Sequence, residues 1–249
     1  MNRSTLKSQA RAIVSSQRKP ILIASALCLA LTLLLTYLSS RLTLPTSDQL
    51  QELSQRFGER ILQQDYDGAA RLLASYQPSR LESLVSELLT YLGSVVGFGF
   101  LLLLFRAVRG QEVAPGMLLD GFSTLLKVLL LTVLTQLILT FCLWALIVPY
   151  FIALYSYRMA RYLMILHPEY GVIDCLRESR LRMRGHRIEF FLLDLSFLGW
   201  ALLCAVPLLG LAVAVWVLPY WNCSELLFCE AVNSRFESGA PAREETGIY

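Results

Sequence analysis

The sequence predicts an all-α polytopic transmembrane helix bundle of about six spans with one interfacial amphipathic helix. Hydrophobic residues make up 55% of the 249 residues and charged residues only 16%, against about 25% charged residues in ordinary soluble domains. Four stretches carry no charge, namely 20–40, 88–105, 128–157 and 195–224. Because backbone N–H and C=O groups find no water in hydrocarbon, continuous apolar stretches of this length cross a bilayer only as helices.

The first span is predicted at 21–41, after a cytoplasmic basic N-terminal segment, 1–20. Basic residues ahead of an apolar stretch also begin secretory signal peptides, whose apolar core is about 7–15 residues long and ends at a small-residue cleavage site. Here the apolar stretch is longer and runs into Ser39, Ser40 and Arg41 without such a site. The pattern therefore favours a retained helix.

Residues 42–83 are predicted to form an extracytoplasmic amphipathic segment. Thr46 and Gln49 have the spacing of a helix-capping box, and apolar residues follow them at helical spacing: Leu50, Leu53, Phe57 and Ile61. Ser79 and Glu82 repeat the capping signal just before the next apolar stretch. We expect an amphipathic helix that lies on the outer membrane face or packs on the bundle.

The membrane core is predicted over 84–232, where prolines divide the two longest apolar stretches. Pro149 interrupts the first, because proline removes an intrahelical hydrogen bond and clashes with the preceding turn. Pro207 interrupts the second, whereas Pro219 is either a kink in the last span or its start. The predicted spans are 84–105, 127–147, 150–166, 188–206 and 208–232.

The distribution of Lys and Arg predicts that both termini lie inside. Short cytoplasmic loops carry an excess of these residues. With the N-terminus inside, fifteen of the 22 Lys and Arg residues fall on the inner side, and the five on the outer side are offset by six acidic residues. The last residues, 233–249, then form a cytoplasmic polar tail.

A short interfacial helix is predicted at 168–185. Pro168 and Glu169 suit a first helical turn, and Gly185 suits a helix C-terminus. The apolar face consists of Val172, Leu176, Ser179 and Met183. Arginines on and beyond the opposite face are candidate contacts for anionic lipid headgroups, namely Arg177, Arg180, Arg184 and Arg187. An ordinary topology signal would place the same arginines there, so both interpretations stay open.

Ionisable side chains inside the predicted spans are candidate functional residues, because charge is costly in hydrocarbon. At about 1.5 Å per residue, Arg161 and Asp194 lie at similar depths from the inner ends of their spans. The candidate intramembrane polar cluster is Arg158, Arg161, Asp194, Glu225 and Glu230. It would serve transport of an ion, a proton or a small anionic solute; the alternative is a static set of ion pairs that fixes helix register.

Two other classes of function are weaker. Gly93 and Gly97, with Gly99 beside them, have a spacing that permits close helix approach. Such an approach would pack helices together within the bundle. Alternatively, it would join copies of the chain in an oligomer, as in a membrane scaffold or a protein that interacts with lipids or partners. His167 and His186 match no catalytic or metal motif, and the six cysteines form no C-x-x-C pair. We therefore expect no enzyme, cofactor or metal site, and the charge of +3 does not indicate nucleic-acid binding.

The second half of the chain carries a series of sequence landmarks. They are VRGQEV at 108–113, LDGF at 119–122, HPE at 167–169, MRGHR at 183–187, FLLDLSFLGW at 191–200 and LPY at 218–220. Together they resemble a bacterial integral-membrane family, domain of unknown function 975 (DUF975), over about residues 84–232. The resemblance implies a multi-pass protein of the bacterial cytoplasmic (plasma) membrane and leaves the function open.

Overall fold

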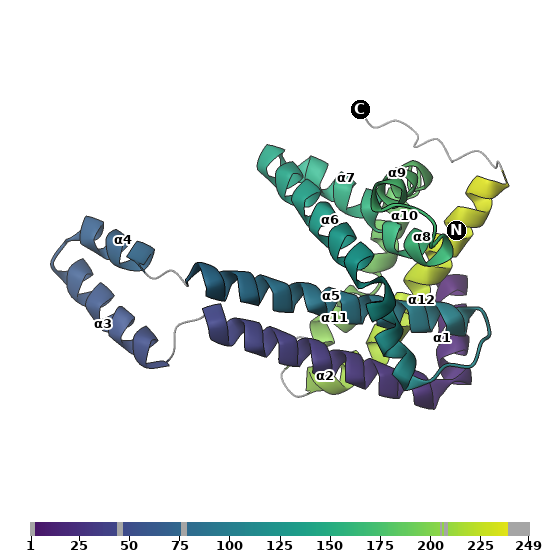
Figure 1. Ribbon diagram of the computed structural model, residues 1–249, viewed down its shortest axis with the longest axis horizontal. Helices are drawn as coiled ribbons and strands as arrows, with labels where there is room; N and C mark the ends of the chain where they lie inside the picture. Colours follow the sequence, from purple (N-terminus) through teal and green to yellow (C-terminus); the bar gives the residue numbers. More distant parts are fainter. Residues whose placement is uncertain (1–2, 44–46, 76–78, 205, 207–208, 239–249) are drawn as a thin grey trace. The chain divides into compact units, whose positions relative to one another are not determined.

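The computed structural model of the chain is all-helical over the residues that it describes, which are 3–43, 47–75, 79–204, 206 and 209–238. No strand occurs among these residues, so the predicted all-α class is confirmed. The chain divides into two compact units: one contains Leu31–Gly93, and the other contains the residues up to Ala30 together with those from Ser94 onward (Figure 1).

Among the described residues, four helices are long and apolar enough to cross a membrane. They are α2 (Arg18–Thr43), α5 (Arg80–Val108), the 3-10 helix η1 (Pro115–Thr124) continued by α6 (Leu125–Ala145), and α12 (Leu209–Glu237). A bilayer core needs about 20 apolar residues, and each helix exceeds that length. On α6, Phe141 is 77% exposed and Trp144 is 88% exposed. Apolar surface of this kind indicates a membrane-embedded protein.

The predicted spans 150–166 and 188–206 are each two short helices. The first consists of α7 (Ile147–Tyr157) and α8 (Ala160–Leu166), and the second of α10 (Arg187–Leu195) and α11 (Leu198–Cys204). Six unbroken spans are therefore not found. Leu146 is extended and separates α6 from α7, so that Pro149 falls in the first turn of α7, where proline is tolerated. Pro219 lies inside α12, and Pro207 lies outside the described residues.

Side chains from other helices bind the backbone at both breaks. The Ser179 hydroxyl donates to the carbonyl of Ser156 at 2.7 Å, just before the α7–α8 break. The Lys7 ammonium donates to the carbonyl of Ser196 at 3.0 Å, in the α10–α11 break. A carbonyl freed from helical hydrogen bonding needs such a partner in an apolar environment. These contacts explain how apolar segments are interrupted without leaving those carbonyls unpaired.

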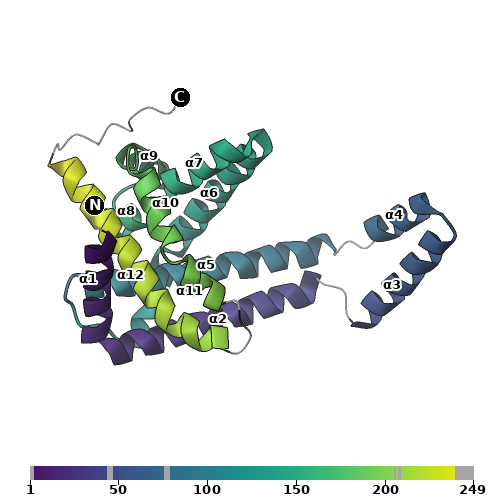
Figure 2. The same ribbon diagram turned by 180° about the vertical axis from the view of Figure 1, so that it is seen from behind.

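The N-terminal basic segment contains an amphipathic helix, α1 (Arg3–Ser16), that packs along α12 (Figure 2). Its buried residues recur every fourth position: Leu6, Ala10 and Val14. A second apolar cluster joins α5, α6, α8 and α9 (Val172–Arg182). Its buried members are Val95, Phe98, Val128, Leu131, Ala160, Met164, Val172, Cys175 and Leu176.

Helix α9 replaces the predicted helix 168–185 and is shorter at both ends. Pro168 and Glu169 do not form its first turn, because Gly171 caps the helix and its N–H donates to Asp174 at 3.3 Å. Gly185 adopts φ +77°, as expected for a residue just beyond a helix end. The predicted apolar face is buried against neighbouring helices of the chain, with Ser179 and Met183 both fully buried.

The unit Leu31–Gly93 contains a helical hairpin of α3 (Ser47–Leu62) and α4 (Tyr66–Ser75). Helix α3 includes the predicted apolar series from Leu50 to Ile61, whereas Thr46 lies outside the described residues. The predicted capping box before α5 is confirmed: Ser79 N–H donates to Glu82 at 2.8 Å, and Glu82 N–H donates to the Ser79 hydroxyl at 3.2 Å.

Candidate functional site

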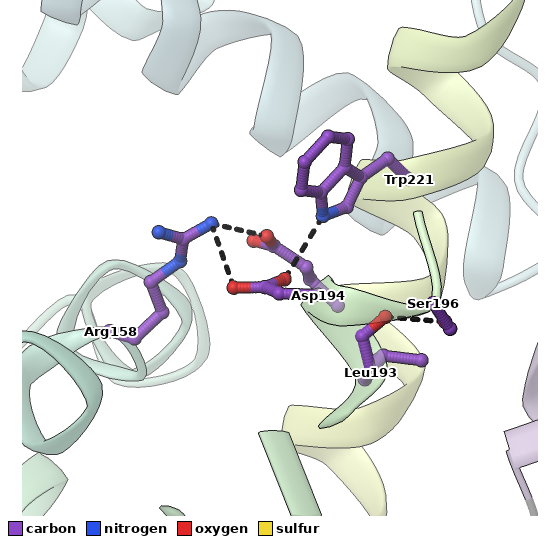
Figure 3. Close-up of polar contacts among 6 residues, drawn as sticks. Arg158, Leu193, Asp194, Ser196 and Trp221 are labelled. Carbon is purple, nitrogen blue, oxygen red and sulfur yellow. Dashed lines mark hydrogen bonds and ion pairs between the residues drawn. The ribbon is translucent and has the colours of Figure 1, made fainter. Parts of the chain in front are cut away.

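Three of the predicted polar residues meet inside the unit that holds most of the helices. Arg158 lies at the α7–α8 break, Asp194 in the last turn of α10 and Glu225 in α12. An Nη atom of Arg158 lies 2.5 Å from Glu225 and 3.9 Å from Asp194. Figure 3 shows the Arg158 side chain pointing toward Asp194, with Trp221 approaching the same carboxylate. We call Arg158, Asp194 and Glu225 the charge cluster.

The charge cluster is shielded from solvent and held by further groups. The side chains of Asp194 and Glu225 are only 14% and 11% exposed. The Trp221 indole N–H donates to Asp194 at 3.1 Å, and next to Asp194 the Ser196 hydroxyl donates to the Leu193 carbonyl (Figure 3). Two carboxylates share one guanidinium, so the cluster carries an excess negative charge that favours a nearby cation.

Arg161 supplies a nearby positive charge without touching the carboxylates. Within the described residues it forms no hydrogen bond or ion pair, and it interacts with Glu225 only through space. Both Arg158 and Arg161 line a cavity of about 200 Å³. The Nε atom of Arg158 is buried and has no hydrogen-bond partner in the described part of the chain. Two guanidinium groups therefore have donors to offer to a molecule in the cavity.

The cavity is lined by both polar and apolar residues, and none of the described residues that line it is acidic. The polar lining consists of Ser94, Thr132, Thr135, Gln136 and Tyr157, together with the two arginines. Thr132 donates to the Val128 carbonyl at 2.8 Å and lies 3.3 Å from the Ser94 hydroxyl. Hydroxyl, amide and guanidinium groups can donate hydrogen bonds to an oxyanion.

The polar residues with which α6 lines the cavity were not predicted, although the sequence carries a signal for them. Thr132, Thr135 and Gln136 are spaced at i, i+3 and i+4 in an otherwise apolar stretch, which places them on one face of α6. Arg182 was also missed. It is buried, and it donates hydrogen bonds to Asn233 and to Glu178, so that it ties α9 to the end of α12.

Glu230 does not join the charge cluster. It lies 3.6 Å from Arg109, which follows the end of α5. Five residues separate Glu230 from Glu225, which corresponds to a rotation of about 140° around a helix. Glu225 and Glu230 therefore face different neighbours, and Glu230 lies outside the charge cluster.

The arginines predicted to contact lipid headgroups divide into two groups. Arg177, Arg180 and Arg184 are exposed, on or just beyond α9. Arg187 is half-buried and lines a second, more open cavity of about 470 Å³ beside Tyr155. The first three therefore remain available to headgroups, whereas Arg187 faces an apolar cavity.

The glycines and histidines also differ in their surroundings. A Cβ atom at Gly93 or Gly97 would meet nothing within 4 Å, whereas one at Gly99 would lie 2.0 Å from the carbonyl oxygen of Leu118. Close packing within the chain therefore uses Gly99, and oligomerisation through Gly93 and Gly97 stays a prediction.

His186 lies 3.3 Å from Glu189. Among the described residues, no group of His, Cys, Asp and Glu could hold a metal ion.

Comparison with known proteins adds a family to this geometry. No curated protein and no solved structure matches the chain. One family model, described as protein of unknown function DUF975, matches residues 81–236, which is more than half of the chain and contains every residue of the charge cluster and its cavity. The predicted resemblance is confirmed: the chain belongs to the DUF975 family.

Proposed function

We propose that this chain is a multi-pass protein of the bacterial cytoplasmic membrane that moves a small anionic solute across it. The observation that carries the proposal is the cavity of about 200 Å³, which is lined by Arg158, Arg161 and neutral hydrogen-bonding groups and by no acidic residue among those described. Charged groups at membrane depth are costly, and in membrane proteins they mark pathways for ions and solutes.

The proposed topology has six crossings, of which two are broken helices, and both termini inside. Two contacts support it. The Lys127 ammonium at the start of α6 donates to the Pro168 carbonyl at 2.6 Å, so the chain returns through α7 and α8 to the end of α6 from which it left. Arg182, which precedes α10, binds Asn233 near the end of α12. The chain that leaves from Arg182 through α10 and α11 therefore comes back through α12 to the same end of the bundle. Broken helices near a binding site are a feature of many transporters.

The proposed mechanism rests on the competition for Arg158. In the described structure Glu225 and Asp194 both contact one Nη atom of Arg158, and the Nε atom of Arg158 has no hydrogen-bond partner among the described residues. An anion in the cavity would bind Arg161 first, because Arg161 has no carboxylate in contact. It would then draw Arg158 away from Glu225, which couples occupancy of the cavity to the contact between the α7–α8 break and α12.

A flux measurement tests the proposal. The purified chain is reconstituted into liposomes, and uptake of phosphate, acetate and chloride is followed with labelled ions. We expect uptake of at least one of these anions and a decrease of about tenfold or more in R161Q, as for loss of a charge-assisted contact. R235Q removes the same charge from an exposed site outside the cavity and should leave uptake unchanged. Folded protein without flux of any of these anions would overturn the proposal.

A second candidate function is a membrane scaffold with a static charge cluster. It is favoured by the contacts already made in the cluster, since Asp194 is bound by Trp221 and Glu225 by Arg158. D194N separates the two candidates. A lower yield of folded protein, together with a wild-type chain that transports nothing, supports the scaffold. Normal folding with altered flux supports transport.

A further inference from the structure

A separate pocket lies between α1, the start of α2 and α12. Its volume is about 260 Å³, and it is lined by Arg11, Val14, Ser15, Arg18, Trp216 and Tyr220. All six residues belong to the same compact unit. None of them takes part in the charge cluster or lines its cavity, so the pocket is independent of the proposed transport function.

Among the residues that the structure describes, no carboxylate forms an ion pair with either arginine of this pocket. The first acidic residue of the sequence is Asp48, so α1 and α2 supply none. On α12, Glu225 binds Arg158, Glu230 binds Arg109, and Glu237 accepts a hydrogen bond from Asn233. Within the described residues neither Arg11 nor Arg18 forms an ion pair, and the Arg11 guanidinium lies 5.9 Å from the centre of the Tyr220 ring. Two uncompensated guanidinium groups therefore face one pocket.

The remaining walls of the pocket are suited to a lipid. Val14 and Tyr220 are buried, and the half-buried Trp216 adds an indole ring. Arg18 is the first residue of the apolar helix α2, so the pocket lies at a boundary between apolar and polar parts of the chain. Tryptophan and tyrosine are enriched where membrane proteins meet lipid headgroups, and basic residues beside an apolar span attract anionic lipids.

We infer that this pocket binds the phosphate group of an anionic phospholipid, with Arg11 and Arg18 on the phosphate and the acyl chains beside Val14 and Trp216. A guanidinium binds phosphate oxygens through paired hydrogen bonds, and two of them compensate the charge of the group. An anionic headgroup is preferred because the ammonium of a zwitterionic headgroup would be repelled by the two arginines beside the phosphate. The site fastens α1 to the membrane surface.

Quenching of tryptophan fluorescence tests the inference on the full chain in neutral detergent. The protein is titrated with brominated phosphatidylglycerol, with brominated phosphatidylcholine of the same acyl chains, and with inorganic phosphate as competitor. We expect saturable quenching at lower concentrations of phosphatidylglycerol, with a component that disappears in W216F. R11Q/R18Q should weaken this binding roughly thirtyfold, at about 1 kcal/mol for each basic residue.

The matched control is R3Q/K19Q, which removes two positive charges from the same segment. Because neither residue lines the pocket, this change should leave the affinity for a single lipid molecule within about twofold. Helical content by circular dichroism identifies variants that do not fold. If R11Q/R18Q is destabilised, R11K/R18K serves in its place, because it keeps both charges and should bind the lipid better than R11Q/R18Q does. Equal quenching by both lipids would overturn the inference, and so would an equal loss in the control. Displacement of the lipid by micromolar inorganic phosphate would assign the site to free phosphate instead.

Discussion

The guanidinium of Arg158 donates a hydrogen bond of 2.5 Å to the carboxylate of Glu225, across 67 residues of the chain. This contact joins the α7–α8 break to α12, next to the hydrogen bond that joins Asp194 of α10 to Trp221 of α12. Three helical segments that are far apart in the sequence are thereby connected through one group of charges. The contact is the structural basis of both candidate functions, because it either holds the helices in place or is exchanged when a solute enters.

Removing the cation of the charge cluster should destabilise the protein more than removing one of its two carboxylates. R158M leaves the buried carboxylates of Asp194 and Glu225 without the guanidinium that they share, whereas E225Q leaves Arg158 with Asp194 at 3.9 Å. Loss of one partner that leaves a buried charge uncompensated costs about 3–5 kcal/mol. Thermal unfolding in detergent should therefore rank E225Q above R158M. The reverse order would show that the contact with Glu225 contributes more to stability than the charge balance of the cluster.

G99A should destabilise the protein, and G97A on the same helix should not. A Cβ at Gly99 would lie 2.0 Å from the carbonyl oxygen of Leu118, so α5 and η1 would have to separate. Overpacking of this kind costs about 1–3 kcal/mol. At Gly97 a Cβ meets nothing within 4 Å, and alanine is a better helix former by up to about 1 kcal/mol. Denaturation of both variants in the same detergent is the measurement, and equal stability would contradict the close approach.

The α3–α4 turn should loosen when Asp65 is protonated. The Gly68 N–H donates to this carboxylate at 2.9 Å, and Arg60 lies 2.7 Å from it. The hydrogen bond from the Gly68 N–H, and after it the contact with Arg60, hold the pKa of Asp65 below its usual value. A lowered pKa in the folded state means that the contribution to stability is complete above the ordinary pKa of aspartate and is lost as the pH falls through the lowered pKa.

Amide hydrogen exchange across residues 47–75, corrected for the intrinsic pH dependence of exchange, measures this effect on the full chain. Protection should fall as the pH drops below about 4, near the ordinary pKa of aspartate. D65N should show reduced protection that no longer changes over this range. An unchanged pH dependence in D65N would mean that another group is responsible.

A topology with six membrane crossings and a topology with four crossings place the start of α9 on opposite sides of the membrane. Single cysteines are introduced into a cysteine-free background at three exposed positions, S54C in α3, I173C in α9 and S238C after α12. With six crossings an impermeant thiol reagent labels S54C in intact cells and labels I173C and S238C only after permeabilisation. Labelling of I173C in intact cells would instead support four crossings.

Local sequence determined the features that depend on near neighbours in the chain. The apolar stretches predicted the four long helices, and the spacing of Ser79 and Glu82 predicted a capping box that the structure contains. Such features depend on composition and on contacts within one or two helical turns. The helix-end glycine Gly185 could also be predicted locally, because only its own backbone conformation, with φ +77°, is involved.

The tertiary structure alone decided which distant groups meet. The sequence shows that Glu225 and Glu230 are both costly in a membrane, but the crossing of helices assigns one to Arg158 and the other to Arg109. The same crossing selects Gly99 for close packing instead of Gly97. At the α10–α11 break, the side chain of Lys7, which is 189 positions away in the sequence, reaches the carbonyl of Ser196. Each outcome depends on how side chains pack between elements far apart in sequence, and local spacing carries no information about that packing.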